Sequence, residues 1–333
     1  MKKSKILTIA LIACLVLLAA GSWMMFGKSA GISLANADQY TAGDAEITDP
    51  VENLDVEWTA GKVTVEYHEG EGIRISETCR QALAEDRKMR WWLDGTTLRI
   101  RYEKSGFRLF SFGDAEKHLT ISLPEGAELK DVKIATTSGD QVIPDLKAES
   151  VCIRSTSGDV DAAVRTGELT GGSTSGSVKI RVAGDCGNVQ MSTTSGGIAL
   201  EIENAKEIRA ESTSGSVALA LSGKADNVKL GSTSGRIACT AAEVKKADIG
   251  STSGGIAVDF GAAEELKIHC TSGGIRAALP KEPGFTCKVS TTSGDFNTSM
   301  ALEKNGNTYS CGDGSGKYEI SATSGDVTIE EKK

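Results

Sequence analysis

The chain has 333 residues, of which 45 are acidic and 37 are basic, so its formal net charge at pH 7 is −8. This acidic balance lacks the basic surface that nucleic acid requires, which argues against nucleic acid as a partner. Aromatic residues make up only 5% of the chain, which favours a thin core of small aliphatic side chains over the core of a large globular domain.

The first thirty residues, 1–30, predict a membrane anchor or signal segment. Lys2, Lys3 and Lys5 precede an uncharged apolar run over residues 6–26. The run is long enough to cross a bilayer as a helix, and the lysines favour an N-terminus that stays inside the cell. We therefore expect one transmembrane helix, a single-pass location at the cell membrane, and a C-terminal domain outside the cytoplasm.

Two other outcomes stay open for this segment. The sequence Ala35-Asn36-Ala37 fits a small-residue cleavage site, and cleavage near Ala37 would make the protein secreted. The sequence Leu11-Ile12-Ala13-Cys14 resembles the lipid-attachment motif of bacterial lipoproteins. The chain stays apolar after Cys14, however, where those proteins turn polar, so lipidation is the weakest of the three interpretations.

Two segments precede the repeats described below. Residues 31–50 predict a linker, and residues 51–125 predict an N-terminal β cap, because stacked strands need atypical ends that block their open edges. The cap begins with a degenerate first coil, in which Thr59-Ala60-Gly61 stands where later coils have Thr-Ser-Gly. The apolar positions of this coil are Leu54, Val56, Trp58, Val63 and Val65.

A tripeptide repeat organises the rest of the chain. Thr-Ser-Gly occurs ten times between Thr137 and Gly325, with a spacing near 19 residues until a last step of 31. A fixed period of this length indicates a stack of equivalent units, each of which is completed by its neighbours.

The residues around each tripeptide alternate between apolar and polar. Val189 and Met191 precede Thr194, and Ile198 and Leu200 follow it, with the same spacing in the other coils. A period of two is typical of β-strands. Serine and glycine suit a tight turn between them, because glycine tolerates positive φ and serine can bond to the local backbone.

These features predict an all-β fold, namely a parallel two-sheet β-solenoid of about 19 residues per coil over residues 126–333. Each coil would have two five-residue strands, a fixed turn at the tripeptide and a variable second turn such as 183–188. Gln141 departs from the pattern, because it stands where an inward aliphatic residue is expected. A hairpin insertion is predicted near 303–317, and the final strand, 326–330, would form an edge protected by the charged residues that follow it.

The run of tripeptides, the sequence Leu119–Gly126 and the ending Gly316–Ile329 resemble the DUF4097 family of bacterial envelope proteins. The resemblance covers residues from about 50 to 330. It implies a repetitive β architecture, and the family includes putative adhesins and proteins of cell-envelope stress operons. It brings no catalytic motif, and it implies no cofactor.

Two sets of repeated side chains are candidates for catalytic or metal-binding sites. Ten serines stand in identical turns, but a catalytic serine is singular and needs a base within reach. Aspartates follow the tripeptide at some coils, as at Asp140 and Asp159. Stacked on each other, they could form a weak cation site or the acid pair of a polysaccharide-cleaving enzyme. Other residue types take that position in the middle coils, which favours plain turn residues. We expect no catalytic, cofactor-binding or metal-binding residue.

Seven cysteines follow the N-terminal segment, and an exported chain would be expected to pair them. Cys239, Cys270 and Cys287 fall at different positions of the repeat, so stacking of the coils does not bring them within bridging distance. We predict that these three are small core residues with free thiols. The pairing of the other cysteines stays open.

One basic and aromatic patch lies between residues 73 and 112. Nine basic residues stand against five acidic ones between 73 and 108, on a chain that is otherwise acidic. Cations beside aromatic rings could bind an anionic polymer or lipid head groups, while the alternative is that the aromatic residues cover the first coil. The candidate binding residues are Arg99, Arg101, Lys104, Phe107, Arg108, Phe110 and Phe112.

The sequence thus predicts a membrane-anchored, extracytoplasmic and non-enzymatic β-solenoid that acts in adhesion or in the envelope stress response. The expected partners are the membrane, through the N-terminal helix, and a cell-wall polymer, lipid head groups or an envelope protein. Two alternatives stay open: a scaffold that self-assembles or binds a partner, and a polysaccharide-active enzyme. The outward positions of the coils show no cluster of carboxylates, which argues against the enzyme.

Overall fold

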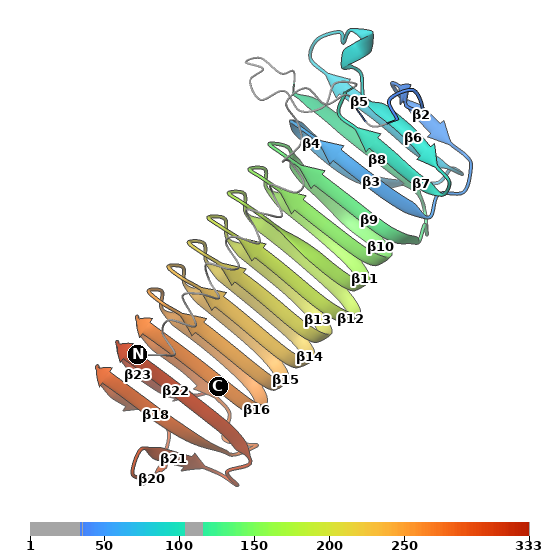
Figure 1. Cartoon of the computed structure of the whole chain (residues 1–333). Coiled ribbons are helices and arrows are strands. Elements are labelled where there is room, and N and C mark those ends of the chain that lie inside the picture. The colour runs from blue at the N-terminus through green and yellow to red at the C-terminus, as the bar shows by residue number, and fades with distance from the viewer. Residues whose placement is uncertain (1–33, 35, 104–115, 333) are drawn as a thin grey trace.

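The protein is seen here in a computed structural model, which describes residue 34 and residues 36–103 and 116–332. Over these residues the chain forms an elongated rod, with strands side by side along its length (Figure 1). Apart from one turn of 3-10 helix, η1 (Glu85–Arg87), the described regular structure consists of β-strands. The all-β part of the prediction is confirmed.

The middle of the rod is a regular stack in which each strand pairs in parallel with the next one along the chain. From β10 to β16 each strand fills the space between two successive tripeptides. The strands are β9 (Leu129–Thr136), β10 (Asp140–Ser155), β11 (Val160–Ser173), β12 (Val178–Thr193), β13 (Ile198–Ser212), β14 (Val217–Ser232), β15 (Ile237–Ser251) and β16 (Ile256–Ser272).

The predicted inward positions of the repeat are confirmed. In β12, Val178, Ile180, Val189 and Met191 each expose at most 1% of their surface. The register places Val178 opposite Ile198 and the following aliphatic residues opposite their equivalents one coil on. The core is therefore a set of parallel columns of aliphatic side chains that run along the rod, and water is excluded from these columns.

The prediction of two short strands per coil in two separate sheets is wrong. The strands β10 to β16 are 14 to 17 residues long, and all the strands join one mixed sheet. At the predicted variable turn, 183–188, strand β12 continues with a shift in register between Val182 and Asp185. Neighbouring coils still exchange backbone hydrogen bonds at this corner, so extra residues are absorbed as bulges and no turn is needed.

The tripeptide glycine is required by close packing between coils, and not by the positive φ that the sequence suggests. Among these glycines only Gly325 has a positive φ. A Cβ atom added to Gly215 would lie 1.9 Å from the carbonyl oxygen of Gly196, and one added to Gly235 would lie 2.0 Å from that of Gly215. Any side chain at this position would push successive coils apart.

Gln141 keeps the register of the repeat despite its polar side chain. The residue is fully buried, and its amide nitrogen donates to the Thr136 hydroxyl at 3.0 Å and to the carbonyl oxygen of Arg154 at 2.7 Å. It pairs with Val63 on one side and Val160 on the other. A hydrogen-bonded amide thus takes the place of an aliphatic side chain where the repeats meet the N-terminal coils.

The N-terminal end stacks its coils out of sequence order. Strand β3 lies between β7 and β9, and β4 lies between β8 and β10, so the first coil of the sequence is the second in space. Antiparallel strands then cover the open ladder. The strands of this end are β1 (Thr41–Ala42), β2 (Ala45–Ile47), β3 (Asn53–Trp58), β4 (Gly61–His68), β5 (Ile73–Cys79), β6 (Arg90–Asp94), β7 (Thr97–Arg101) and β8 (Lys117–Pro124).

A buried ion pair holds the outermost N-terminal coil. Lys117 exposes 1% of its surface, and its Nζ lies 3.0 Å from a carboxylate oxygen of Glu77. The same ammonium donates to the backbone carbonyls of Arg87 and Tyr102, and it lies 5.1 Å from the ring centre of Trp58. Burial lowers the pKa of Lys117 even though Glu77 opposes the shift, so this cation is held at a cost in hydration.

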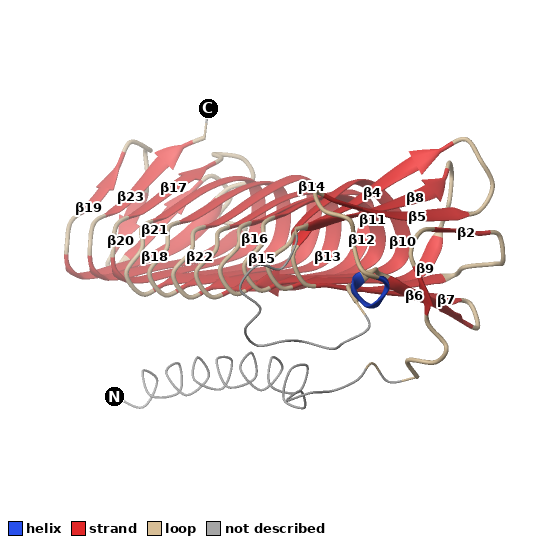
Figure 2. Cartoon of the chain, turned by 90° about the horizontal axis from the view of Figure 1, so that it is seen from above, coloured by secondary structure: helices blue, strands red, loops and turns tan. Residues whose placement is uncertain are grey.

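The C-terminal end shows the same inversion (Figures 1 and 2). Strand β22 lies between β16 and β18, and β23 lies between β17 and β19. The prediction that the final strand forms an edge is wrong, because β23 has a partner on both sides. The strands are β17 (Ile275–Leu279), β18 (Phe285–Ser293), β19 (Phe296–Thr298), β20 (Glu303–Asn305), β21 (Thr308–Cys311), β22 (Gly316–Ser324) and β23 (Val327–Glu331).

The true end of this ladder is an antiparallel hairpin. Strand β21 pairs with the outer side of β18, and β20 pairs with β21. All three residues of β20 are exposed, and they include Glu303 and Lys304. Charged side chains on a short edge strand discourage pairing with other chains.

The described cysteines are free thiols. Cys239, Cys270 and Cys287 are buried in the core, which confirms the prediction for these three. Burial raises the pKa of Cys239 to about 12 and that of Cys287 to about 12. These thiols therefore stay protonated and unreactive at neutral pH.

The prediction of a single-pass membrane protein has to be corrected. In the part of the chain that the structure describes, no helix is both long enough and apolar enough to cross a membrane. The apolar run over residues 6–26, on which the prediction rested, lies outside the described residues.

Candidate functional site

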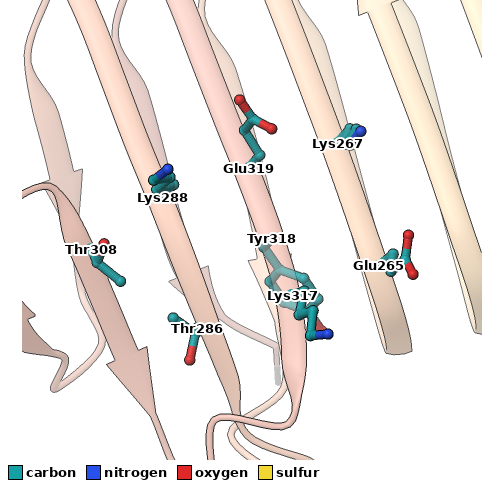
Figure 3. Close-up of a pocket in the computed structure, with 8 residues that line it drawn as sticks. All are labelled: Glu265, Lys267, Thr286, Lys288, Thr308, Lys317, Tyr318 and Glu319. Atoms are coloured by element: carbon teal, nitrogen blue, oxygen red, sulfur yellow. The ribbon is translucent and has the colours of Figure 1, made fainter.

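An open hollow of about 440 Å³ lies on the outer face of the rod near its C-terminal end (Figure 3). It is framed by β16, β22, β18 and β21. The lining residues are Glu265, Lys267, Thr286, Lys288, Thr308, Lys317, Tyr318 and Glu319.

The inserted strand β22 brings these side chains together. Its residues alternate, so that Lys317 and Glu319 face outward while Tyr318 and Ile320 are buried. Each outward residue falls in a row with residues of both neighbouring strands. The two rows are Glu265, Lys317 and Thr286, and Lys267, Glu319 and Lys288.

Three lysines of the hollow have no ion-pair partner in the part of the chain that the structure describes. Glu265 is engaged by Lys246, whose Nζ lies 3.2 Å from its Oε1. Within the described residues, no ion pair engages Lys267, Lys288 or Lys317. The hollow therefore offers cationic groups on a chain whose overall charge is negative.

The base of the hollow is formed by the buried Tyr318. Its hydroxyl donates to the carbonyl oxygen of Ala263 at 3.0 Å, and its ring stacks on Phe285 with 4.9 Å between ring centres. Burial raises the pKa of Tyr318 to about 12, so the phenol is neutral at physiological pH. It is a rigid and uncharged support for the lysines above it.

This arrangement is suited to binding an acidic chain molecule. Lys267 and Lys288 stand two strands apart, which places their backbones roughly 10 Å from each other. Ammonium groups attract carboxylates and phosphates as point charges. The two carboxylates of the hollow, those of Glu265 and Glu319, stand beside lysines in the rows, and its lining contains no histidine or cysteine.

A family model described as Toastrack DUF4097 matches residues 51–181, 125–226 and 172–330, which together span 51–330. The chain belongs to this Toastrack family. The resemblance that the tripeptides and the chain ending suggested is confirmed. A comparison with curated protein sequences gives no match.

Several solved structures are similar to this Toastrack rod. A putative cell adhesion protein from Clostridium sporogenes has 12% identity and a TM-score of 0.21, covering 88% of this chain and 100% of that one. A putative adhesin from Bacteroides fragilis has 14% identity and a TM-score of 0.37, with coverages of 88% and 96%. A putative adhesin from Parabacteroides merdae has 13% identity and a TM-score of 0.44, with coverages of 89% and 97%.

Arg99 and Arg101, the two candidate residues of the basic patch that the structure describes, lie in β7 of the Toastrack rod and already have carboxylate partners. Arg99 lies 2.9 Å from Asp55 and 3.0 Å from Asp94, and Arg101 lies 2.7 Å from Asp55. Burial opposes ionisation of Asp55, but Arg101 and other nearby cations outweigh it and hold the pKa of Asp55 below its usual value. The other predicted residues, Lys104, Phe107, Arg108, Phe110 and Phe112, lie outside the described residues. The patch stays a prediction.

The aspartates that follow the tripeptide hold neighbouring coils together. The amide of Asp159 donates to Asp140 Oδ1 at 2.9 Å, and the amide of Ser177 donates to Asp159 Oδ1 at 2.7 Å. At the far end, the amide of Asp295 donates to Asp326 Oδ1 at 2.9 Å. The carboxylates of Asp140, Asp159 and Asp326 thus each accept a backbone N–H from the neighbouring coil, which is a structural role in the stack.

Sequence reasoning missed the lysine hollow, although a signal for it was present. Lys267, Lys288 and Glu319 stand at the same position of the repeat, four before a tripeptide threonine. If the coils stacked in sequence order, Lys267 and Lys288 would lie directly opposite each other, which is destabilising. The last coil has the acidic Glu319 at this position. The alternation of lysine and glutamate could have indicated that the last coil is inserted between the two coils that carry the lysines.

Proposed function

We propose that this Toastrack chain is a non-enzymatic, adhesin-like protein that binds acidic polymers of the bacterial envelope through the C-terminal hollow. The observation that carries the proposal is the set of lysines 267, 288 and 317, which line one hollow and have no ion-pair partner among the described residues. On a chain of net charge −8, such a concentration of cationic groups favours a negatively charged ligand.

The ligand is expected to be an extended polymer with carboxylate or phosphate groups. The open hollow follows the outer face of four neighbouring strands, so it fits a chain lying across them. Thr286 and Thr308 add hydroxyl and backbone groups that can bond to the sugar or polyol part of such a chain. The glutamates at 265 and 319 would disfavour a ligand whose negative charge is continuous, such as a nucleic acid.

The test compares two variants with the same change in net charge. Binding of fluorescent polygalacturonate and of polyphosphate is measured at rising salt for Lys267→Gln/Lys288→Gln/Lys317→Gln. We expect an affinity loss of roughly tenfold or more for the polymer that is bound, together with a shallower salt dependence. The matched control is Lys179→Gln/Lys206→Gln/Lys224→Gln, which neutralises three exposed lysines elsewhere on the rod. An equal loss in both variants would contradict a specific site.

The predicted basic patch is the second candidate site for the same class of ligand, and lipid head groups are the second class of ligand to test there. Arg99→Gln/Arg101→Gln neutralises the two candidate binding residues of the patch that the structure describes. Because both arginines have carboxylate partners, we expect a smaller loss of polymer binding than at the hollow. A larger loss of polymer binding than at the hollow would indicate that the patch is the binding site. Binding to anionic vesicles that this variant abolishes would indicate the same.

We extend the proposal to the envelope stress response that the family resemblance suggests. A host strain that carries the triple lysine variant should be more sensitive to a cell-wall antibiotic than a strain that carries the control variant. Equal sensitivity of the two strains, at equal protein level, would contradict the role in the stress response without contradicting polymer binding.

A further inference from the structure

The final coil of the chain is inserted between two coils that precede it in sequence. The amide of Gly273 donates to the carbonyl oxygen of Ser324 at 3.0 Å, and the amide of Gly325 donates to that of Ser293 at 3.2 Å. The last tripeptide thus lies between the two tripeptides before it. Strands β22 and β23 fill a slot that has β16 and β17 on one side and β18 and β19 on the other (Figures 1 and 2).

The outward side chains make this slot specific for its occupant. Glu319 separates Lys267 from Lys288, which would otherwise repel each other. On the other half of the coil, Arg276 donates to Glu330 at 2.7 Å. Among the described residues, Arg276 and Glu330 form an ion pair across this boundary, whereas Glu319 stands in register between the two lysines without pairing to either.

The inward side chains of the occupant are equally well matched. Tyr318 stacks on Phe285 of the far wall and bonds to the carbonyl oxygen of Ala263 on the near wall. Ile320 and Val327 are fully buried in the columns of the core. The slot is therefore a complete binding site for the segment 316–331, with backbone ladders on both sides.

The inserted coil is tied to the rest of its own chain by one short connection. Strands β21 and β22 lie on opposite sides of β18, so the turn 312–315 has to cross the start of that strand. The amide of Gly316 and the hydroxyl of Ser315 both donate to the carbonyl oxygen of Gly284, at 2.9 Å and 3.1 Å. Insertion into the chain's own slot depends on this crossing.

We propose that two copies of this chain can exchange their C-terminal coils, residues 316–331, to form a reciprocal dimer. Each copy carries the same slot and the same occupant, so a coil donated by a second copy makes every contact described above and only the crossing turn changes course. The exchange goes beyond polymer binding, and it preserves the hollow, because the partner's β22 supplies the lysine and glutamate that line it.

The length of the crossing turn should decide between the two forms. Deleting Asp313 and Gly314 leaves too little chain to cross β18, so the coil can reach only the slot of a second copy. We expect loss of the monomer and appearance of a species of twice its mass in native mass spectrometry. Inserting six Gly/Ser residues after Asp313 relaxes the crossing, and this matched variant should be monomeric at the same concentration.

Co-refolding of the full-length chain provides the second readout. Copies with two different affinity tags are unfolded in guanidinium and refolded together at high concentration, and dimers captured by one tag are probed for the other. We expect mixed dimers after joint refolding and none when copies are refolded separately and then mixed. Dimers that mix without unfolding would show surface association and overturn the proposal.

A deletion variant that stays monomeric, or wild-type protein that is monomeric at every refolding concentration, would also overturn the exchange. If the deletion variant does not fold, the refolding of the wild-type chain still decides. Polymer binding is measured on the same samples, so failure of the exchange and failure of the proposed function are distinguished. If the dimer forms but neither the dimer nor the monomer binds polymer, the exchange stands and the proposed function is contradicted.

Discussion

The middle of the rod and its two ends solve the same packing problem in different ways. From β10 to β16 the coils stack in sequence order, and each contributes the same aliphatic columns and the same tripeptide glycine. At each end one coil is out of order, β3–β4 in one case and β22–β23 in the other. Residues that follow the repeat form the stack, and residues that depart from the repeat cover its two ends.

The ends depend on side chains that occur once. At the N-terminal end Lys117 and Glu77 form a buried ion pair beside Trp58, and at the C-terminal end Tyr318 bridges both walls of its slot. In the middle, apart from Gln141, the residues of a column are mostly small or aliphatic side chains that the neighbouring coils repeat in kind. Substitutions should therefore have local and specific effects at the ends, and effects set by repeat position in the middle.

The largest effect is expected from Lys117→Met at the N-terminal end. It leaves Glu77 buried without a cation, which typically costs about 3–5 kcal/mol of the free energy of unfolding. Guanidinium unfolding followed by circular dichroism measures it. The double variant Lys117→Met/Glu77→Leu removes both charges and should recover most of the loss. If the double variant were as unstable as the single one, packing rather than the ion pair would hold this end.

The next effect is expected in the middle, from Gly215→Ala. The new Cβ would meet the carbonyl oxygen of Gly196 at 1.9 Å, and the coils must separate to admit it, at a cost of roughly 3 kcal/mol. Gly197→Ala is the matched control, because its nearest contact would be the Ser216 carbonyl oxygen at 3.6 Å. Equal unfolding midpoints for the two variants would contradict the close packing of the tripeptide backbones.

A smaller effect is expected from Tyr318→Phe at the C-terminal end. The variant keeps the ring but loses the hydrogen bond to Ala263, which should cost about 1 kcal/mol at neutral pH. The pKa of Tyr318 is raised to about 12 from 10.0 in the folded state. Its contribution is therefore complete below pH 10 and is lost as the pH rises from 10 to about 12.

The Phe variant should lose less stability than the wild type over that alkaline range, since it has no phenol to ionise. Guanidinium midpoints at pH 7, 10 and 11 provide the comparison. Parallel losses in both proteins above pH 10 would show that another group, such as a buried thiol, dominates the alkaline response.

Sequence reasoning recovered what repeats and missed what depends on order in space. The aliphatic positions follow from period and parity, and the structure confirms them. The continuous strands were missed because a polar, variable segment such as 183–188 looks like a turn, although its backbone stays in the ladder. The glycine was expected for its φ, but the contact that requires it belongs to the neighbouring coil.

The same limit applies to the candidate site. Arg99 and Arg101 stood out because they are close in sequence, yet β3 supplies a carboxylate, that of Asp55, to both of them. Lys288 and Lys317 are far apart in sequence and join one hollow only because β22 is inserted beside β18. A repeat period does not reveal that a coil is inserted out of sequence order. Opposite charges at the same repeat position in different coils do indicate such an insertion.

The smallest effect is expected from Arg276→Gln, which tests whether charges fix the position of the last coil. Arg276 pairs with Glu330 at 2.7 Å but its side chain is 69% exposed, so the cost should be less than about 1 kcal/mol and should vanish in high salt. Arg181→Gln is the control from the middle, where the distance to Asp161 is 3.9 Å, and it should have no measurable effect. If the two variants behave alike, backbone pairing and the stacked Tyr318 hold the coil, and the surface charges act only to disfavour the sequential order in which Lys267 would face Lys288.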